Sequence, residues 1–248
     1  GSESGNAALI NNEELGLKRA YTSDVIRPKF AFLNPELTYS LPDYVTSCGV
    51  VDIYSHVIER YFAPQTSIGV MDYLCEAIFR CLLTFGPKVR KTPLDYDTRA
   101  EVMWCGTIAH NDTCGVGRIQ DWGSHMIAHE ISALYDTAHG ATLSIIIPAW
   151  MKYVYKNDLE RFARYAVSVH GIEYNPSDLE NIALMGIKRT IEFFKTMGLP
   201  TTFKEANLPV DKLEEMAKKA ADGCGGTVGN FVPLKYQDVL NILQMAIG

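Results

Sequence analysis

Two pairs of metal-binding residue types, each with four-residue spacing, lie in segments that have helical periodicity. His56 follows Asp52 at four residues, His129 follows His125 at four, and His139 comes ten residues later. Side chains four apart lie one above the other on an α-helix, so each pair presents two potential ligands on one face. The chain is therefore expected to fold into helices that bring these faces together.

A cluster of this kind favours a bound cation. A single histidine on an apolar helix face is more often a hydrogen-bonded core residue than a ligand. An aspartate buried with several histidines is different, because without a cation the lost hydration would destabilise the fold by roughly several kcal/mol. The pattern therefore predicts one mononuclear metal site, which uses Asp52 and histidines drawn from His56, His125, His129 and His139.

Other metal motifs fit the sequence less well. A His-Glu-x-x-His protease motif would need a histidine where Ala133 stands, and His-x-x-Glu-His would need a glutamate at Ala128. A di-iron bundle would need Glu-x-x-His pairs, but Ile53, Trp122 and Met126 precede the helical histidines at that spacing. A single-metal site is therefore favoured.

The first 41 residues differ from the rest of the chain. Short extended runs at residues 7–10, 17–21 and 30–33 are separated by turn-forming Asn, Asp and Pro, which predicts strands without a complete sheet. From Ser40 the pattern becomes helical. Ser40-Leu41-Pro42-Asp43 offers an N-cap hydroxyl, an early proline and an acid, so a long helix is expected from there to about Tyr61.

The remaining sequence is predominantly helical. Helical periodicity recurs at about residues 67–85, 96–114, 121–134, 140–155, 159–169, 176–197, 210–221 and 235–246. This indicates an α domain of about eight helices. Gly223-Cys224-Gly225-Gly226 does not match a dinucleotide-binding glycine motif and is typical of a helix C-cap that leads into a loop.

Composition excludes several classes of function. The net charge of −6 comes without a basic block, so nucleic-acid binding is not expected. The longest apolar stretch, residues 141–150, is far shorter than the ~20 residues that span a bilayer, and no secretory signal is visible. The six cysteines lack CxxC spacing, which favours free thiols in a reducing cytoplasm. A soluble cytoplasmic protein that binds neither nucleic acid nor membrane is predicted.

The combined motifs resemble the iron-containing (group III) alcohol dehydrogenases, in particular the branch of butanol dehydrogenases and broad aldehyde reductases. The resemblance extends over nearly the whole chain, including Phe30 to Pro42. It rests on Gly49-Val-Val-Asp52-x-x-x-His56-x-x-Glu59, Asp121-Trp122-x-x-His125-x-x-x-His129-Glu130, His139-Gly140-x-Thr142-Leu143 through Pro148, and Gly229-Asn230-Phe231 to Pro233.

This resemblance implies a fold and its domains. Residues 42–248 would form the all-helical metal-binding catalytic domain of the dehydroquinate synthase-like fold. Residues 1–41 would be the C-terminal remnant of a nucleotide-binding α/β domain, with a few strands. Because that family places its phosphate loop in a preceding domain, we expect this chain to bind metal but to turn over poorly by itself.

The resemblance also implies the roles of individual residues. Asp52, His56, His125 and His139 would hold one divalent metal, Fe²⁺ or Zn²⁺. His129 would lie near the nicotinamide without binding the metal, either as a relay for the hydroxyl proton or as a packing residue. Ser2, in Gly1-Ser2-Glu3, and Lys18 would contact the cofactor. His110 and His170, which lack partners at suitable spacing, are expected to be structural or exposed.

The implied reaction interconverts a small alcohol and its aldehyde, with NAD(H) or NADP(H) as the cofactor. The metal would act as a Lewis acid that stabilises an alkoxide, while a hydride passes to or from the nicotinamide. A homodimer is expected for the parent protein. Two alternatives remain open at this point: another dehydroquinate synthase-like metalloenzyme, of the glycerol dehydrogenase type, and a non-catalytic helical metal-binding module. The sequence does not distinguish iron from zinc as the metal, or NAD from NADP as the cofactor.

Overall fold

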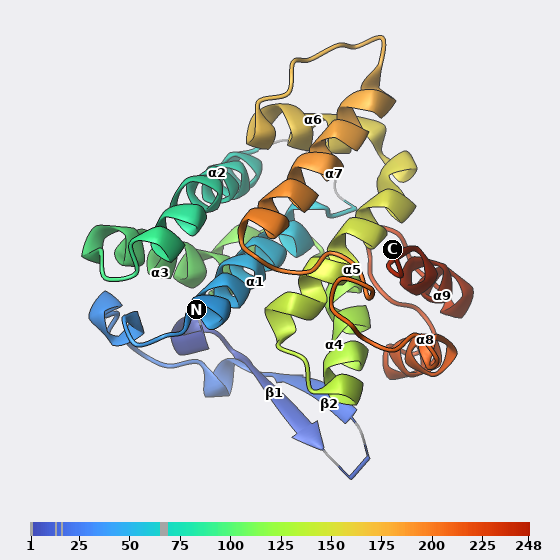
Figure 1. Cartoon of the computed structure of the whole chain (residues 1–248), viewed down its shortest axis with the longest axis horizontal. Coiled ribbons are helices and arrows are strands. Elements are labelled where there is room, and N and C mark those ends of the chain that lie inside the picture. The colour runs from blue at the N-terminus through green and yellow to red at the C-terminus, as the bar shows by residue number, and fades with distance from the viewer. Residues whose placement is uncertain (1, 13, 16, 65–68) are drawn as a thin grey trace.

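Helices dominate the computed structural model, which describes residues 2–12, 14, 15, 17–64 and 69–248 (Figure 1). Within these ranges there are nine α-helices and one two-stranded sheet. The helices are α1 (Asp43–Tyr61), α2 (Val70–Lys91), α3 (Tyr96–His110), α4 (Gly123–Tyr135), α5 (His139–Val154), α6 (Leu159–His170), α7 (Leu179–Thr196), α8 (Leu213–Gly223) and α9 (Tyr236–Met245). The predicted, predominantly helical architecture is confirmed.

Three local predictions were wrong. Helix α1 begins at Asp43 with Pro42 as its N-cap and no side-chain cap, so the hydroxyl of Ser40 does not cap it. Helix α3 ends at His110, and a separate 3₁₀-helix, Thr113–Gly115, follows it. The third predicted strand, residues 30–33, has no regular structure. Nothing in the described sheet pairs with this segment, and Pro35 starts a 3₁₀-helix, Pro35–Thr38, directly after it.

A β-hairpin precedes the helices. Strand β1 (Ala7–Asn12) pairs antiparallel with β2 (Leu17–Thr22), from Ala7 opposite Thr22 to Asn12 opposite Leu17. The hairpin packs on α4, where Nη1 of Arg19 lies 3.0 Å from Oε1 of Glu130. It therefore carries Lys18 to the side of α4 that bears His129. Whether residue 41 marks a domain boundary remains a prediction.

Helix α1 runs through the centre of the molecule (Figure 1). It packs against α2 and α3 on one side and against α5 on the other. Beyond its exposed first turn, most of its apolar residues are buried, and Val51, Tyr54, Val57 and Ile58 are fully buried. Burial of this part of α1 explains why it can hold polar side chains in fixed positions, because neighbouring helices leave them little rotamer freedom.

The sequence also predicted that the cysteines are free thiols and that no segment spans a membrane. All six cysteines are free thiols, as predicted. In the part of the chain that the structure describes, no helix combines the length and the apolar character needed to cross a bilayer.

Helices α1 and α5 come into close backbone contact at Gly140. A Cβ atom at this position would lie 2.2 Å from the carbonyl oxygen of Cys48 and 2.6 Å from its Cα. Backbone atoms of a packed helix cannot move aside as a flexible side chain can. The missing side chain at Gly140 therefore allows His139, the first residue of α5, to lie close to α1.

Replacing Gly140 by alanine should separate α1 from α5. We expect the free energy of unfolding to fall by roughly 1–3 kcal/mol, as in other overpacked cores. Gly49 is a matched control, because it also lies in a helix but a Cβ there has no described atom within 4 Å. Gly49→Ala should stabilise the chain by up to about 1 kcal/mol. Urea unfolding measures both variants, and equal stability of Gly140→Ala and the unmodified chain would contradict the tight contact.

Candidate metal centre

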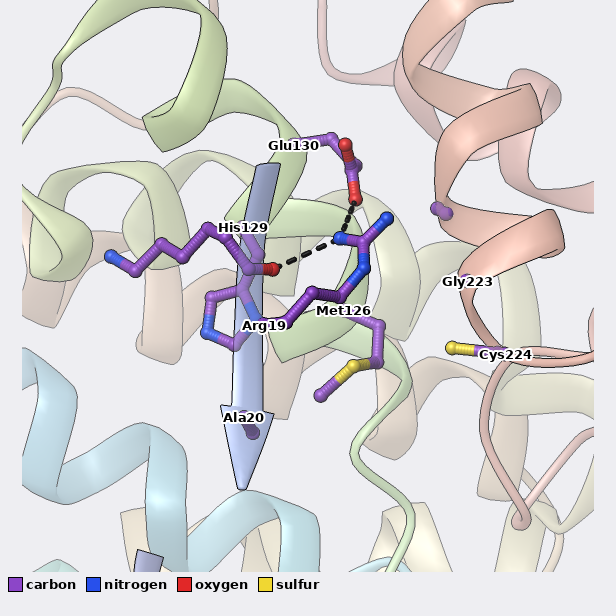
Figure 2. A pocket seen from close by; sticks show the side chains of 9 residues that line it. Arg19, Ala20, Met126, His129, Glu130, Gly223 and Cys224 are labelled. Atoms are coloured by element: carbon purple, nitrogen blue, oxygen red, sulfur yellow. Dashed lines mark hydrogen bonds and ion pairs between the residues drawn. The ribbon is translucent and has the colours of Figure 1, made fainter. Parts of the chain in front are cut away.

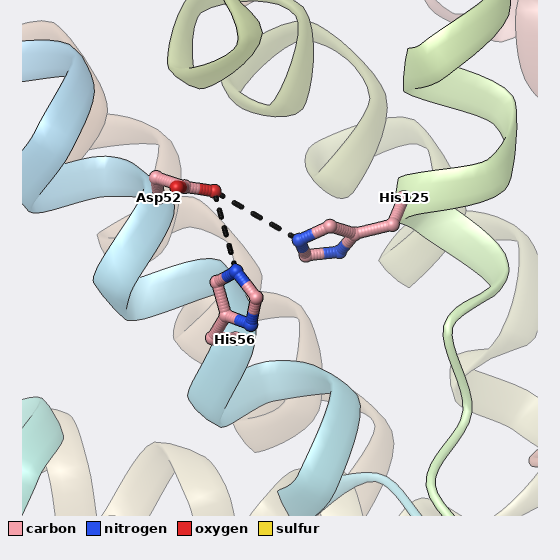
Figure 3. Close-up of side chains that lie close together, drawn as sticks. All are labelled: Asp52, His56 and His125. Atoms are coloured by element: carbon pink, nitrogen blue, oxygen red, sulfur yellow. Dashed lines mark ion pairs between the residues drawn. The ribbon is translucent and has the colours of Figure 1, made fainter. Parts of the chain in front are cut away.

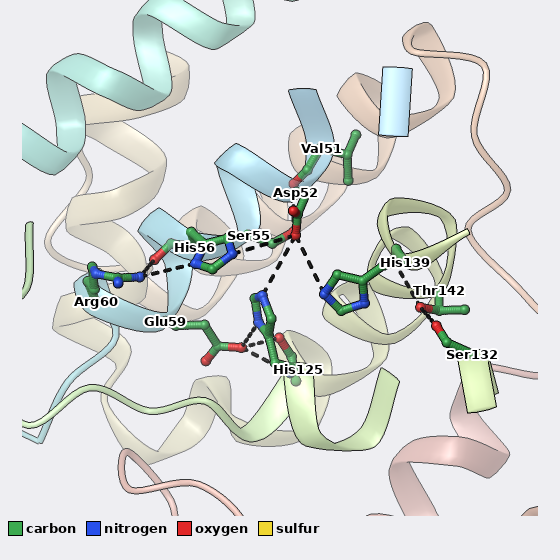
Figure 4. A network of polar contacts seen from close by, with 11 residues as sticks. Val51, Asp52, Ser55, His56, Glu59, Arg60, His125, Ser132, His139 and Thr142 are labelled. Carbon is green, nitrogen blue, oxygen red and sulfur yellow. Dashed lines mark hydrogen bonds and ion pairs between the residues drawn. The ribbon is translucent and has the colours of Figure 1, made fainter. Parts of the chain in front are cut away.

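Three helices bring one carboxylate and three imidazoles together (Figure 4). Asp52 and His56 come from α1, His125 from the first turn of α4, and His139 from the start of α5. The Nε2 atoms of His56, His125 and His139 lie 3.8, 3.8 and 3.6 Å from Oδ1 of Asp52. The four residues that the sequence predicted as ligands therefore point toward a common region.

These separations suit a shared cation. Metal bonds from nitrogen and oxygen of about 2.0–2.2 Å place tetrahedral ligand atoms roughly 3.3–3.6 Å apart. The tightest group is Asp52, His56 and His125, whose ligand atoms all lie within 4.8 Å of one another (Figure 3). His139 approaches the same carboxylate oxygen but does not belong to this tighter group.

Burial leaves several of these polar atoms without partners. Oδ1 of Asp52 and Nε2 of His125 are both inaccessible and accept no hydrogen bond in the described part of the chain. The Asp52 side chain as a whole is 35% exposed, although Oδ1 itself is inaccessible. Unpartnered buried polar atoms are destabilising, and a cation between them would compensate both.

The pKa shifts of two histidines favour the neutral form, in which an imidazole binds a metal. Burial, reinforced by the neighbouring His125, lowers the pKa of His56 and that of His139 well below the usual value of histidine. Both imidazoles are therefore neutral at pH 7, the form in which histidine binds metals. Burial raises the pKa of Asp52, and His125 partly offsets this effect.

His129 lies beside this cluster. Its ring centroid is 5.0 Å from that of His139 and 6.2 Å from that of His125. Burial lowers the pKa of His129 to about 3, and its Nε2 atom is buried without a hydrogen-bond partner. His129 therefore adjoins His139, whereas the histidine nitrogens within 4 Å of Oδ1 of Asp52 are those of His56, His125 and His139.

A small pocket opens next to His129 (Figure 2). Lys18 and Arg19 of β2, Glu130 of α4 and Cys224 are among its lining residues. Burial lowers the pKa of Lys18, although the charge of Asp52 opposes this shift. Ser2 begins a 3₁₀-helix, Ser2–Ser4, but its side chain lies outside what the structure describes.

Glu59 received no role from the sequence, and His110 was expected only to be structural or exposed. Oε1 of Glu59 accepts a hydrogen bond from Nδ1 of His125 at 2.7 Å. Positions 52, 56 and 59 share one helix face, and this spacing could have indicated that Glu59 lies near Asp52 and His56. His110 is not isolated, because its ring centroid lies 4.7 Å from that of His56. His170 is structural, as expected, since it hydrogen-bonds the buried Tyr165.

An indole ring packs against two of the imidazoles. Trp122 makes edge-to-face contacts with His56 and His125, at centroid distances of 5.4 and 5.1 Å. Its φ of 64° is unusual for a bulky residue and indicates local strain. Asp121 holds this turn, because its carboxylate accepts hydrogen bonds from the backbone of Gly123, Asn230 and Phe231. Asp121 thus joins the turn before α4 to the segment Gly229-Asn230-Phe231.

Fold and site together define a helical domain with a candidate mononuclear metal centre. Residues 46–247 match the Fe-containing alcohol dehydrogenase family, C-terminal, and the chain belongs to this family. NADH-dependent butanol dehydrogenase A of Clostridium acetobutylicum is 38% identical over 98% of this chain and 63% of its own length. The NADPH-dependent aldehyde reductase YqhD of Escherichia coli is 37% identical over 88% of this chain and 56% of its own.

A solved structure agrees with these relatives. The crystal structure of NADH-dependent butanol dehydrogenase A from Thermotoga maritima matches with a TM-score of 0.93 and 33% identity, covering 98% of this chain and 62% of that one. The predicted family and its helical fold are therefore confirmed. The chain spans about 63% of the length of the first curated relative that it matches.

Proposed function

We propose that this chain carries the metal centre of an NAD(P)H-linked alcohol dehydrogenase that reduces small aldehydes, of the butanol dehydrogenase type. The main support is the convergence of three imidazole nitrogens on one carboxylate oxygen, at 3.6–3.8 Å. The similar proteins are named NADH-dependent butanol dehydrogenase and NADPH-dependent aldehyde reductase. A homodimer in the cytoplasm, without nucleic-acid or membrane partners, remains part of this proposal.

In this proposal Asp52, His56, His125 and His139 hold one Fe²⁺ or Zn²⁺ ion. One anionic and three neutral ligands suit either metal and leave the centre with a net positive charge. A divalent ion bound there supplies Lewis-acid polarisation of the substrate oxygen. The four side chains come from three different helices, so they hold this position without a flexible loop.

The neighbouring residues would handle the proton and the cofactor. His129 is neutral at pH 7 because burial lowers its pKa to about 3, so its unpartnered Nε2 can accept a hydrogen bond from a substrate hydroxyl. We assign it the relay of the hydroxyl proton. Lys18, on the hairpin beside α4, would contact the cofactor, and Ser2 would do so from the short helix before β1.

Metal binding should raise the thermal stability of the chain. At 100 to 1,000 times the dissociation constant, Zn²⁺ would add about 3–4 kcal/mol to the free energy of unfolding. For a domain of this size that corresponds to a rise in Tm of roughly 6–16 °C. Differential scanning fluorimetry with Zn²⁺ measures this shift. Mg²⁺, which prefers oxygen ligands in an octahedron, is the control and should leave Tm unchanged. An unchanged Tm with both ions would contradict the metal centre.

The reaction itself is tested by following NADH or NADPH oxidation with butyraldehyde, at a protein concentration high enough to detect the slow turnover expected of this chain. Chelation should abolish the reduction, and Fe²⁺ or Zn²⁺ should restore it. Reduction that continues at the same rate after complete metal removal would contradict the proposed chemistry.

A further inference from the structure

The carboxylate of Glu59 contacts the His125 ring on the side opposite Asp52 (Figure 4). We propose that Glu59 is a positioning residue that sets the tautomer and the orientation of His125. This inference rests on the proposed metal centre, since its subject is how this ligand is held. Glu59 is fully buried, so the contact is shielded from solvent.

The geometry determines which nitrogen of His125 carries the proton. Oε1 of Glu59 lies 2.7 Å from Nδ1 of His125, and a carboxylate oxygen can only accept. Nδ1 therefore carries the hydrogen, and the lone pair of the ring is on Nε2, which faces Asp52. A second polar partner that holds the distal nitrogen is a general way to orient a metal-binding histidine and to raise its basicity.

His125 differs from the other two histidines in this respect. Nδ1 of His56 lies 3.4 Å from Nη1 of Arg60, a cationic donor that cannot accept a proton from the ring. Nδ1 of His139 is buried without a hydrogen-bond partner among the described residues. Only His125, of these three, has its distal nitrogen held by a carboxylate, so we assign it as the best-oriented ligand of the centre.

The carboxylate oxygen is itself held firmly. It also accepts hydrogen bonds from Oγ of Ser124 at 2.6 Å and from the backbone N–H of His125 at 3.1 Å. These donors belong to the first turn of α4, whose N-cap residue, Trp122, provides no side-chain cap. Glu59, which belongs to α1, thus caps the N-terminus of α4. The helix dipole favours a carboxylate at that position. One residue joins the helix of Asp52 to the helix of His125.

Glu59→Gln tests this role because it keeps the shape and removes the charge. We expect its Kd for Zn²⁺, measured by competition with a chromophoric chelator, to rise by about 10- to 100-fold. The absorption bands of bound Co²⁺ should also shift, because the orientation of one imidazole ligand changes. Loss of fold stability alone would not alter the spectrum of the ion that remains bound.

Glu76→Gln is the matched control. Glu76 is similarly buried and accepts a hydrogen bond from the Tyr61 hydroxyl at 2.9 Å, but it contacts none of the four proposed ligands. Its variant should keep the Kd for Zn²⁺ and the Co²⁺ spectrum of the unmodified chain. If Glu59→Gln also keeps both, the positioning role is overturned while the metal centre stands. If the unmodified chain binds no Zn²⁺, both proposals fail.

A measurement on the unmodified chain avoids dependence on any variant that fails to fold. In the Zn²⁺-loaded chain, long-range ¹H–¹⁵N correlation spectra should show His125 protonated at Nδ1, with a downfield, slowly exchanging proton. A His125 ring that carries its proton on Nε2 would overturn the proposal.

Discussion

His125→Ala is expected to raise the Kd for Zn²⁺ by two to three powers of ten. Structural zinc sites bind with about 10–16 kcal/mol in total, so one ligand of four accounts for roughly 3–4 kcal/mol. The substitution also leaves Glu59 buried without the imidazole that it holds at 2.7 Å. Chelator competition measures the Kd, and elemental analysis of the purified variant should find little metal.

His129→Ala is the control for this experiment. His129 lies one turn later on the same helix and is similarly buried, at 4% exposure against 2% for His125. Because it lies outside the group around Asp52, its loss should leave the Kd for Zn²⁺ unchanged and should impair only turnover. Equal metal loss in both variants would contradict the separation of His129 from the ligands.

The candidate site could be predicted because its main signals are local. Four-residue spacing places Asp52 with His56, and His125 with His129, whatever the rest of the fold does. The same rule could have added Glu59, which lies on the face of α1 that carries Asp52 and His56. Its hydrogen bond to His125 could not be predicted, because it depends on how α1 and α4 pack.

Other features depend on contacts between distant segments. His110 ends α3, yet its ring lies 4.7 Å from that of His56, and no spacing in the sequence indicates this. The extended segment at residues 30–33 has strand-forming residues, but strands require a partner and the described sheet offers none. The helices, by contrast, form their hydrogen bonds within one segment. Their positions were therefore predicted well, and only their ends differed.

The end of α1 is held by a buried ionic network that the sequence did not indicate. Asp72 of α2 is fully buried, and Arg161 of α6 donates to both of its oxygens, at 2.5 and 2.7 Å. Arg161 also donates to the carbonyl oxygen of Tyr61, the last residue of α1. Arg118 lies 3.0 Å from the same carboxylate and donates to the carbonyl oxygen of Arg60. The network thus fixes the helix that carries Asp52 and His56.

Asp72→Asn is expected to lower the free energy of unfolding by about 3–5 kcal/mol at pH 7. The substitution keeps the shape of the side chain but leaves two buried guanidinium groups without their counter-charge. Urea unfolding measures the loss. Asp222→Asn is the control, since Asp222 pairs with Lys218 on the surface, with both side chains at least 65% exposed. No measurable change is expected there.

The pH dependence of the loss in free energy of unfolding tests whether the charge of the Asp72 carboxylate is its cause. Burial alone would raise the pKa of Asp72, but the hydrogen bonds and charges of Arg161 and Arg118 outweigh it and lower the pKa below the usual value. A carboxyl whose pKa is lower in the folded state stabilises the fold above its unfolded pKa and loses this contribution as pH falls through its folded pKa. The difference between Asp72→Asn and the unmodified chain should therefore be full at pH 7 and should shrink in acid. A difference that stays constant down to the acid transition would show that packing, and not charge, holds the end of α1.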